Sequence, residues 1–267
     1  MNQRKYSQVV SSASGFTLVE MAMVLFIIGI MLGGLLTAVG QSAENTNRLE
    51  ARNKLREIEE ALYGFALVQG RLPCPASGTS AGAEVFDTSG NINNGICFSQ
   101  YGLLPNATLG LSGSVNNGVL EDPWGNPYRY SVSGIVPGGG ISDRYTGIDG
   151  IDNIYLNAPT MVSGGPNVLR VCTISTCSTT PPDTIMTNIT PAVILTMGKN
   201  WADIATASAN EQENASGTTL PGSAYVVSNT RDFVLTGYSE ENFDDMVIWI
   251  SPHLLFSKLI TAGQLPL

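Results

Sequence analysis

The chain has 267 residues, of which 43% are hydrophobic and only 13% are charged, and its formal net charge is −9. This acidic balance argues against a nucleic-acid-binding protein, for which a basic patch is expected, so the sequence shows no nucleic acid as a partner. The length suffices for one sizeable hydrophobic core or two small ones. The 29 glycines favour strands and loops over helical repeats in the downstream part.

Residues 1–15 are polar and basic, whereas residues 16–40 are mainly apolar, with Glu20 as their only ionisable residue. A helix over the apolar segment would cover roughly 37 Å at 1.5 Å per residue, enough to cross a bilayer with some tilt. The basic residues Arg4 and Lys5 precede the segment and none lies within it. The positive-inside rule therefore predicts a cytoplasmic N-terminus and an extracytoplasmic chain beyond the segment.

Residues 41–70 have an amphipathic pattern. The apolar positions recur at steps of three and four and form one stripe, made of Leu55, Ile58, Leu62 and Phe65. Because no proline interrupts residues 16–72, we predict one continuous helix of about fifty residues that ends at Gly70. Its first half, residues 16–40, is the transmembrane or assembly half, and its second half is one-sided.

The remaining part, residues 71–267, is predicted to be a β-rich extracytoplasmic domain. Residues 77–95 form a loop by composition. Short β-like runs separated by turn signals predict strands at 127–132, 168–174, 192–197, 224–228, 232–237 and 246–251. Ser251 followed by Pro252 predicts the start of a short helix. The fold class is thus α+β, with the long N-terminal helix packed on an antiparallel sheet that covers its apolar stripe.

All four cysteines lie in the part expected outside the cytoplasm. In an oxidising compartment an even number suggests two disulfides, with three possible connectivities. The short spacing favours a bridge between Cys172 and Cys177, which leaves Cys74 and Cys97 to close the Gly- and Ser-rich loop. A zinc site is the alternative, but the only histidine is His253, far along the chain.

The stretch GFTLVE at residues 15–20 resembles the class III signal of type IV pilins and of the pseudopilins of type II secretion. The resemblance implies that a membrane peptidase removes residues 1–15 by cutting between Gly15 and Phe16, and that Phe16 is then methylated. It also implies three kinds of partner: other pilin-like subunits through their N-terminal helices, the prepilin peptidase/methylase, and an inner-membrane assembly platform. The expected location is the inner membrane, as a single-pass protein, and afterwards a periplasmic or cell-surface filament.

Three further stretches carry a looser resemblance. EDPWGNPYRY at 121–130 is similar to a run found in major pseudopilins of type II secretion, and its simplest structural interpretation is a turn that leads into a strand. LPCP at 72–75 and NFDDMVIWIS at 242–251 are similar to stretches of many pilin-like proteins. Where many relatives carry a proline in the apolar helix, this chain has Thr37. Pilus and pseudopilus both remain open, and the length favours a minor or accessory subunit.

A carboxylate at Glu20 is costly in lipid, at roughly 2.5–3.5 kcal/mol on insertion scales. After cleavage Phe16 would carry an ammonium, and an ion pair with good geometry is far less costly than either charge alone. If the ammonium belongs to a neighbouring subunit, the pair sets the register in which helices assemble. The alternative is that Glu20 only marks the headgroup level, but the flanking GFTLV favours the assembly role.

Two groups of acidic residues could supply oxygen ligands for calcium. They are Asp143, Asp149 and Asp152, and Glu240, Glu241, Asp244 and Asp245. Neither group has EF-hand spacing, and acidic loops are most often solvated, so we expect no cofactor and keep calcium as an alternative.

A single histidine without a nucleophile elbow or a paired-histidine motif does not indicate an enzyme. The sequence therefore predicts a filament subunit, with a membrane-anchored or secreted binding protein that forms no filament as the alternative. The position of the mature N-terminus separates the two.

Overall fold

The computed structural model describes residues 15–87, 96–134, 145–148, 150–157, 169–177, 183–215, 231–239 and 242–265, and for residues 32–41, 153, 156, 157 and 203 it describes the backbone alone. The chain forms two compact units, Met1–Thr46 and Asn47–Leu267. Each unit is described by itself. The strand predicted at 224–228 lies outside the described residues.

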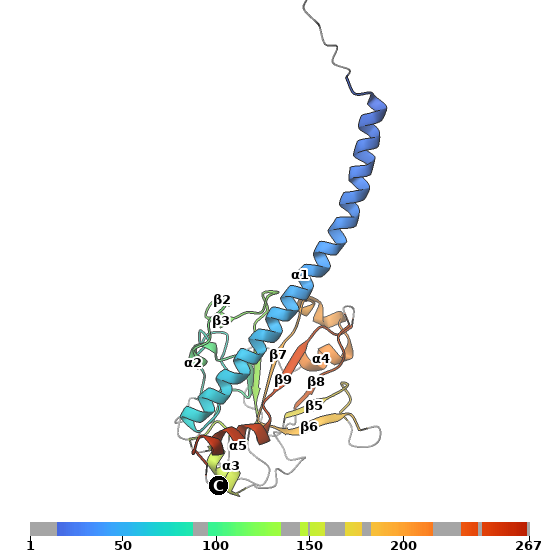
Figure 1. Cartoon of the computed structure of the whole chain (residues 1–267). Coiled ribbons are helices and arrows are strands. Elements are labelled where there is room, and N and C mark those ends of the chain that lie inside the picture. Colours follow the sequence, from blue (N-terminus) through green and yellow to red (C-terminus); the bar gives the residue numbers. More distant parts are fainter. Residues whose placement is uncertain are drawn as a thin grey trace, which may run out of the picture. The chain divides into compact units, whose positions relative to one another are not determined.

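One helix, α1 (Leu18–Gln69), contains 52 residues and runs from the first unit into the second (Figure 1). The predicted continuous helix is confirmed. It ends where the sequence indicated, because Gly70 adopts a left-handed backbone conformation with φ of +63° and its N–H donates to the Ala66 carbonyl at 2.9 Å. Glycine adopts this conformation at a helix end without steric cost.

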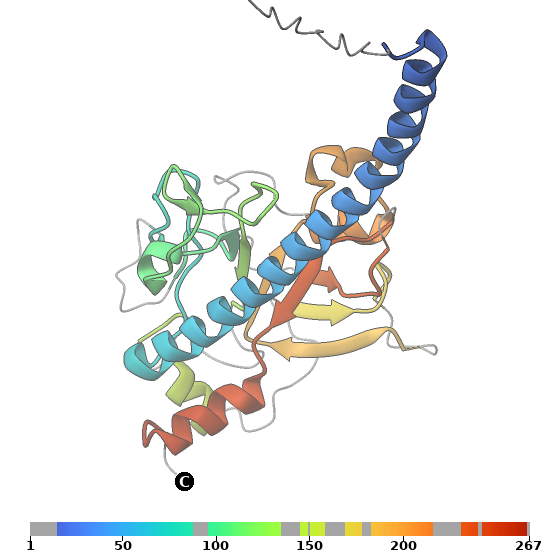
Figure 2. The ribbon, with the colours of Figure 1, turned by 45° about the horizontal axis from the view of Figure 1, so that its top comes forward.

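In the second unit, α1 lies across one face of a four-stranded antiparallel sheet, as Figures 1 and 2 both show. The strand order is β1-β4-β7-β9, with β1 (Tyr101–Leu103), β4 (Arg129–Val132), β7 (Ala192–Thr196) and β9 (Met246–Trp249). The predicted stripe residues Leu55, Ile58 and Leu62 are at most 2% exposed and share one core with Tyr130 and Ile194 of the sheet.

The stripe is nevertheless shifted from its predicted position. Phe65 is only half-buried, while Tyr63 and Ala66 are buried in the core instead. Two short helices complete this core, α3 (Gly150–Asn157) and α5 (Pro252–Thr261). The predicted cap of α5 is present, because the Leu254 N–H donates to the Ser251 hydroxyl oxygen at 3.5 Å.

A second sheet packs against the face of the first sheet that is opposite α1, and its strand order is β6-β5-β8. Its strands are β5 (Leu169–Cys172), β6 (Ile185–Thr190) and β8 (Arg231–Val234). Strands β5 and β6 are antiparallel, but β5 and β8 are parallel. This second layer is therefore mixed, whereas the sheet that faces α1 is antiparallel, as expected. Leu169, Val171 and Phe233 form a second core with Val193 and Leu195 of β7.

The remaining elements are short. They are α2 (Asn106–Leu109), the hairpin of β2 (Val115–Asn116) and β3 (Val119–Leu120), the 3₁₀ helix η2 (Trp201–Thr206) and α4 (Ala209–Ala215). The structure is therefore α+β: a long N-terminal helix and a sheet domain with two main cores and a small third cluster.

Candidate processing and assembly site

The stretch around Gly15 and Phe16 lies immediately before the first turn of α1. Thr17 and Glu20 form a reciprocal capping box there. The Thr17 N–H and hydroxyl donate to Glu20 Oε2 at 3.0 and 3.1 Å, and the Glu20 N–H donates to the Thr17 hydroxyl oxygen at 3.2 Å. A capping box satisfies backbone N–H groups that a helix start leaves unpaired. The helix therefore begins after Thr17, and the Gly15–Phe16 peptide stays outside it and exposed.

The capping role of Glu20 was missed at the sequence level, although the Thr-x-x-Glu spacing is its recognised signal. The expected ammonium partner belongs to processed or assembled protein, and Glu20 is not a member of the ion pairs found among the described residues. In the unprocessed chain the carboxylate is instead held by Thr17.

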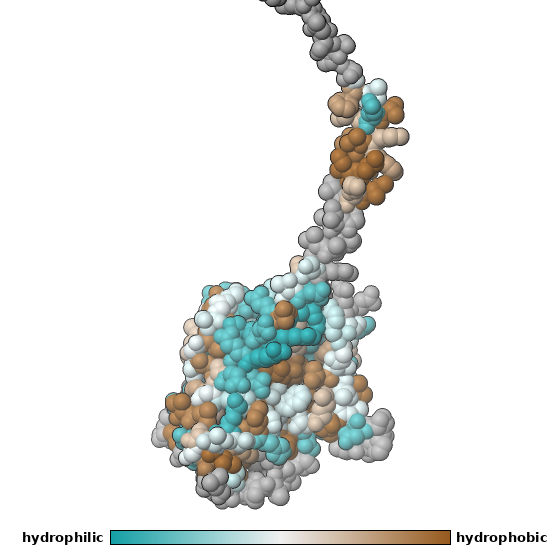
Figure 3. Space-filling model, viewed as in Figure 1, coloured by the Kyte–Doolittle hydropathy of each residue, from teal (hydrophilic) through white to brown (hydrophobic). Residues whose placement is uncertain are grey.

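Apolar side chains predominate on the first turns of α1, with a hydrophilic patch among them (Figure 3). Exposed fractions in this stretch range from 44% at Ile28 to 87% at Leu18, with Phe16 at 82%. Exposed apolar surface of this kind marks a site for membrane or protein contact. Among the described residues, no helix combines the length and hydropathy that crossing a membrane requires.

The cysteines are joined as Cys74–Cys97 and Cys172–Cys177, with Cα atoms 5.3 and 5.7 Å apart. This is the connectivity that the spacing favoured, and no cysteine of the chain is left free. The first bridge ties the segment after α1 to residues beyond the predicted loop.

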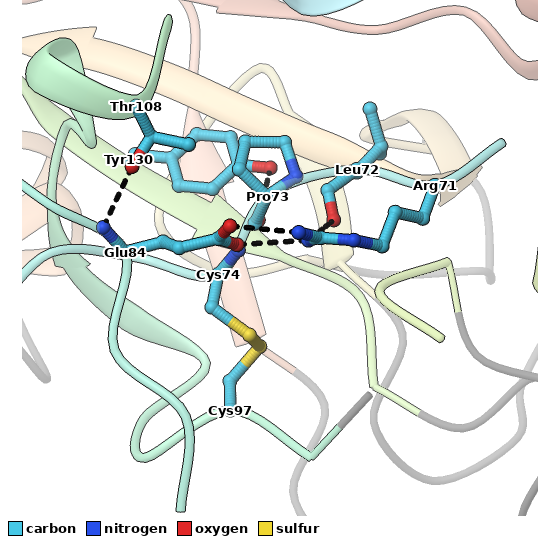
Figure 4. A network of polar contacts seen from close by, with 8 residues as sticks. All are labelled: Arg71, Leu72, Pro73, Cys74, Glu84, Cys97, Thr108 and Tyr130. Atoms are coloured by element: carbon cyan, nitrogen blue, oxygen red, sulfur yellow. Dashed lines mark hydrogen bonds and ion pairs between the residues drawn. A yellow bond between two sulfur atoms is a disulfide. The ribbon is translucent and has the colours of Figure 1, made fainter. Parts of the chain in front are cut away.

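A buried ion pair lies beside the Cys74–Cys97 bridge (Figure 4). Arg71 Nη1 and Nη2 donate to the two carboxylate oxygens of Glu84 at 2.8 and 2.7 Å, and the Arg71 side chain is only 5% exposed. The Cys74 N–H donates to the same carboxylate at 3.0 Å. The Tyr130 hydroxyl donates to the Pro73 carbonyl at 3.1 Å. The LPCP stretch thus fixes the chain to the sheet where α1 ends.

The DPWGN stretch is a turn, as its structural interpretation predicted. The Asp122 carboxylate accepts from the N–H groups of Trp124 and Asn126 at 2.9 and 2.8 Å and from the Thr196 hydroxyl. The Asn126 side-chain amide donates to the Gly198 carbonyl at 2.5 Å. These contacts attach the turn to the segment that follows β7.

Three buried carboxylates come together near the start of β9. Oxygens of Glu211, Asp244 and Asp245 lie within 4.8 Å of one another, so these residues could hold a metal ion. Burial raises the pKa of Asp245 to about 8, although the Asn214 amide, which donates to it at 2.8 Å, opposes the shift. A proton on Asp245 therefore removes part of the negative charge of this cluster.

The structure describes only some of the residues that the sequence offered as calcium ligands. Asp143, Asp149, Glu240 and Glu241 lie outside the described residues, and Asp152 lies on α3. Glu211 was not predicted, because it is more than thirty positions from Asp244 in the sequence and nothing in its local pattern distinguishes it.

A family model described as the prokaryotic N-terminal methylation motif matches residues 10–36. No curated protein and no solved structure matches the chain. The match contains the GFTLVE stretch and the exposed apolar turns. The chain therefore carries the class III signal of type IV pilin-like proteins.

Proposed function

We propose that the chain is a structural subunit of a type IV pilus or of a type II secretion pseudopilus, made as a precursor and assembled through its N-terminal helix. The observation that carries the proposal is the methylation motif at residues 10–36. In the structure its Gly15–Phe16 peptide is exposed and lies directly before a capped helix start. Cleavage there removes residues 1–15, and methylation follows at Phe16.

Three features support this role. The first turns of α1 expose apolar side chains that require a lipid or protein partner. The second unit has its own two main cores and needs no partner to bury them. Its two disulfides suit a compartment outside the cytoplasm. Residues 16–40 would hold the subunit in the inner membrane until it joins a periplasmic or cell-surface filament.

Glu20 changes partner in this mechanism. Before cleavage its carboxylate accepts hydrogen bonds from Thr17. After cleavage the ammonium of Phe16, on the same or a neighbouring subunit, offers a stronger, charge-assisted partner. A pair between neighbours would fix the axial register of the helices, which is the best-attested use of a buried polar group.

The described residues do not decide between a type IV pilus and a type II secretion pseudopilus. The DPWGN turn is the feature shared with major pseudopilins, whereas the chain length and the two disulfides favour a minor or accessory subunit. We propose a non-catalytic subunit in either machine, assembled on an inner-membrane platform after processing by the prepilin peptidase/methylase.

Mass spectrometry of the mature N-terminus tests the proposal most directly. The expected species begins at a methylated Phe16, and Gly15→Ala should leave only the uncut precursor. A mature chain that begins near residue 40, or one that never enters sheared filaments, would establish the alternative of an anchored or secreted binding protein.

A further inference from the structure

Two arginines border the second core, one from each sheet. Arg129 of β4 pairs in register with Leu195 of β7, a residue of that core. Directly opposed residues on neighbouring strands share a face of the sheet, so Arg129 lies on the face that meets the second sheet. Arg231 of β8 is two positions before Phe233, another residue of this core. Alternation along a strand places both on the same side.

Both guanidinium groups lie over aromatic rings. The Arg231 Cζ lies 4.6 Å from the Tyr101 ring centroid and 4.7 Å from that of Phe233, and the Arg129 Cζ lies 5.3 Å from that of Trp201. Tyr101 and Trp201 are half-buried, so they stand at the border of the core. A guanidinium that stacks on a ring keeps the N–H groups at its edge available as donors.

Those donors are incompletely used. The Nε of Arg129 and the Nε of Arg231 are both buried and have no acceptor among the residues that the structure describes. Arg231 is only 7% exposed, and its Nη2 donates to the Asn214 carbonyl at 3.0 Å. A buried donor without an acceptor costs free energy comparable to a lost hydrogen bond.

Two other arginines have carboxylate partners, whereas Arg48, which is 8% exposed, also keeps a buried Nη1 without an acceptor among the described residues. Arg71 makes a bidentate pair with Glu84, and Arg170 makes one with Asp232 at 2.6 Å for each bond. Neither Arg129 nor Arg231 takes part in an ion pair of the described residues.

Near Arg231 the formal charges leave one positive charge in excess, because Arg129, Arg170 and Arg231 stand against two carboxylates, Glu213 and Asp232. Burial lowers the pKa of Arg231 to about 10, and the nearby charge of Arg129 acts in the same direction. Glu213 and Asp232 lie near enough to oppose this shift, but Asp232 is already paired with Arg170. Buried like charges are costly unless an anion compensates them.

We propose that Arg129 and Arg231 form a binding site for an oxyanion, meaning a sulfate, a phosphate or the carboxylate of a larger ligand, with Tyr101 and Trp201 at its border. The two unpaired Nε–H groups donate to the anion. The negative charge of the anion also compensates the positive charge that the nearby carboxylates leave over. Planar guanidinium groups are suited to such oxygens because their donors match the anion geometry. This site is independent of processing and filament assembly.

The full-length chain in detergent micelles tests the proposal by titration with sodium sulfate, sodium phosphate or sodium glucuronate, each compared with sodium chloride at equal ionic strength. At about ten times the dissociation constant, the bound anion should raise the unfolding midpoint by about 3 °C. The arginine Nε–H resonances of Arg129 and Arg231 should shift together. Glucuronate alone would identify a carboxylate-bearing ligand, and sulfate or phosphate an inorganic or esterified anion.

Arg129→Lys keeps the charge but loses the planar fork, and it should weaken binding at least tenfold; Arg231→Lys should do the same. Arg52→Gln, at an exposed position of α1, is the control and should bind as the original chain does. Because Arg129 is half-buried, its variant decides the question even if the Arg231 variant does not fold. Equal midpoints in all salts, or equal binding by Arg129→Lys, would overturn the proposal.

Discussion

Glu20 combines two properties that substitutions can separate. Its oxygen caps α1 by accepting from Thr17, whereas its charge would compensate the ammonium of Phe16 after cleavage. Glutamine keeps an acceptor for the capping box but not the charge. We therefore expect Glu20→Gln to be cut at Gly15 as usual and to enter filaments severalfold less, as measured by immunoblot of sheared filaments.

Thr17→Val is the matched control, because it removes the cap and leaves the charge. It should weaken the helix start by about 1 kcal/mol and permit incorporation. If Thr17→Val were the variant excluded from filaments, and Glu20→Gln entered normally, the cap rather than the charge would explain the glutamate.

Asp245 makes stability depend on pH. Burial raises its pKa to about 8, so between about pH 4 and pH 8 the folded chain holds a proton that the unfolded chain has lost. The free energy of unfolding then falls as pH rises through this range, by at most about 1.4 kcal/mol per pH unit, and levels off above it. Burial also raises the pKa of Asp244, which acts in the same direction.

Thermal unfolding at pH 5, 6.5 and 8 measures this effect, and Asp245→Asn should flatten the profile. A midpoint at pH 8 that rises with calcium, falls with chelator and no longer responds in Asp245→Asn would instead assign a cation to the three carboxylates. A profile that keeps its slope in Asp245→Asn would contradict the assignment to this residue.

The Arg71–Glu84 pair should show strong coupling, because the two side chains are only 5% and 14% exposed beside the Cys74–Cys97 bridge. Loss of one partner leaves an uncompensated buried charge, so Arg71→Met or Glu84→Gln alone should destabilise the protein by about 3–5 kcal/mol. The double variant should cost less than the sum of the two, as measured by urea unfolding. Additive costs would show that the pair is not coupled.

At the scale of elements, the two disulfides differ in the chain length that they close. They span 23 and 5 positions, for which the chain-entropy relation gives about 3 and about 2 kcal/mol. Replacing Cys74 and Cys97 together by serine should therefore lower the urea midpoint more than replacing Cys172 and Cys177. The reverse order would show that native contacts, rather than loop entropy, decide the effect.

Elements with a strong hydrophobic period were predictable from the sequence. Helix α1 and strands β4, β7 and β9 fall at or inside their predicted ranges, because their apolar positions lie in the two main cores. Strand β6 was missed because its sequence, IMTNIT, is half-exposed along most of its length. The short helices α2, α3 and α4 were missed as well, since packing rather than local propensity stabilises elements of this length.

Sites that are formed by residues far apart in the chain could not be predicted from the sequence. GFTLVE indicated the processing site because its residues are consecutive. Glu211 and Asp245 meet only through the packing of distant strands and helices, and so do Arg129 and Trp201 or Arg231 and Tyr101. A single sequence contains no local signal for such meetings.

At the scale of the molecule, the boundary between the compact units falls between Thr46 and Asn47, within α1. The cores that the second unit forms draw on α1 residues from Ala51 onward. The exposed apolar side chains from Phe16 to Met31 belong to the first unit. Folding and assembly should therefore depend on different parts of the same helix.

Removal of residues 1–46 tests this separation. The remaining chain should keep both disulfides and unfold within about 2 °C of the full-length protein in the same detergent, since no residue of its cores is lost. It should stay monomeric without detergent and be absent from sheared filaments, because the apolar surface is gone. A fragment that failed to fold would show that the first unit supports the second, and one that still entered filaments would place the assembly surface on the sheet domain.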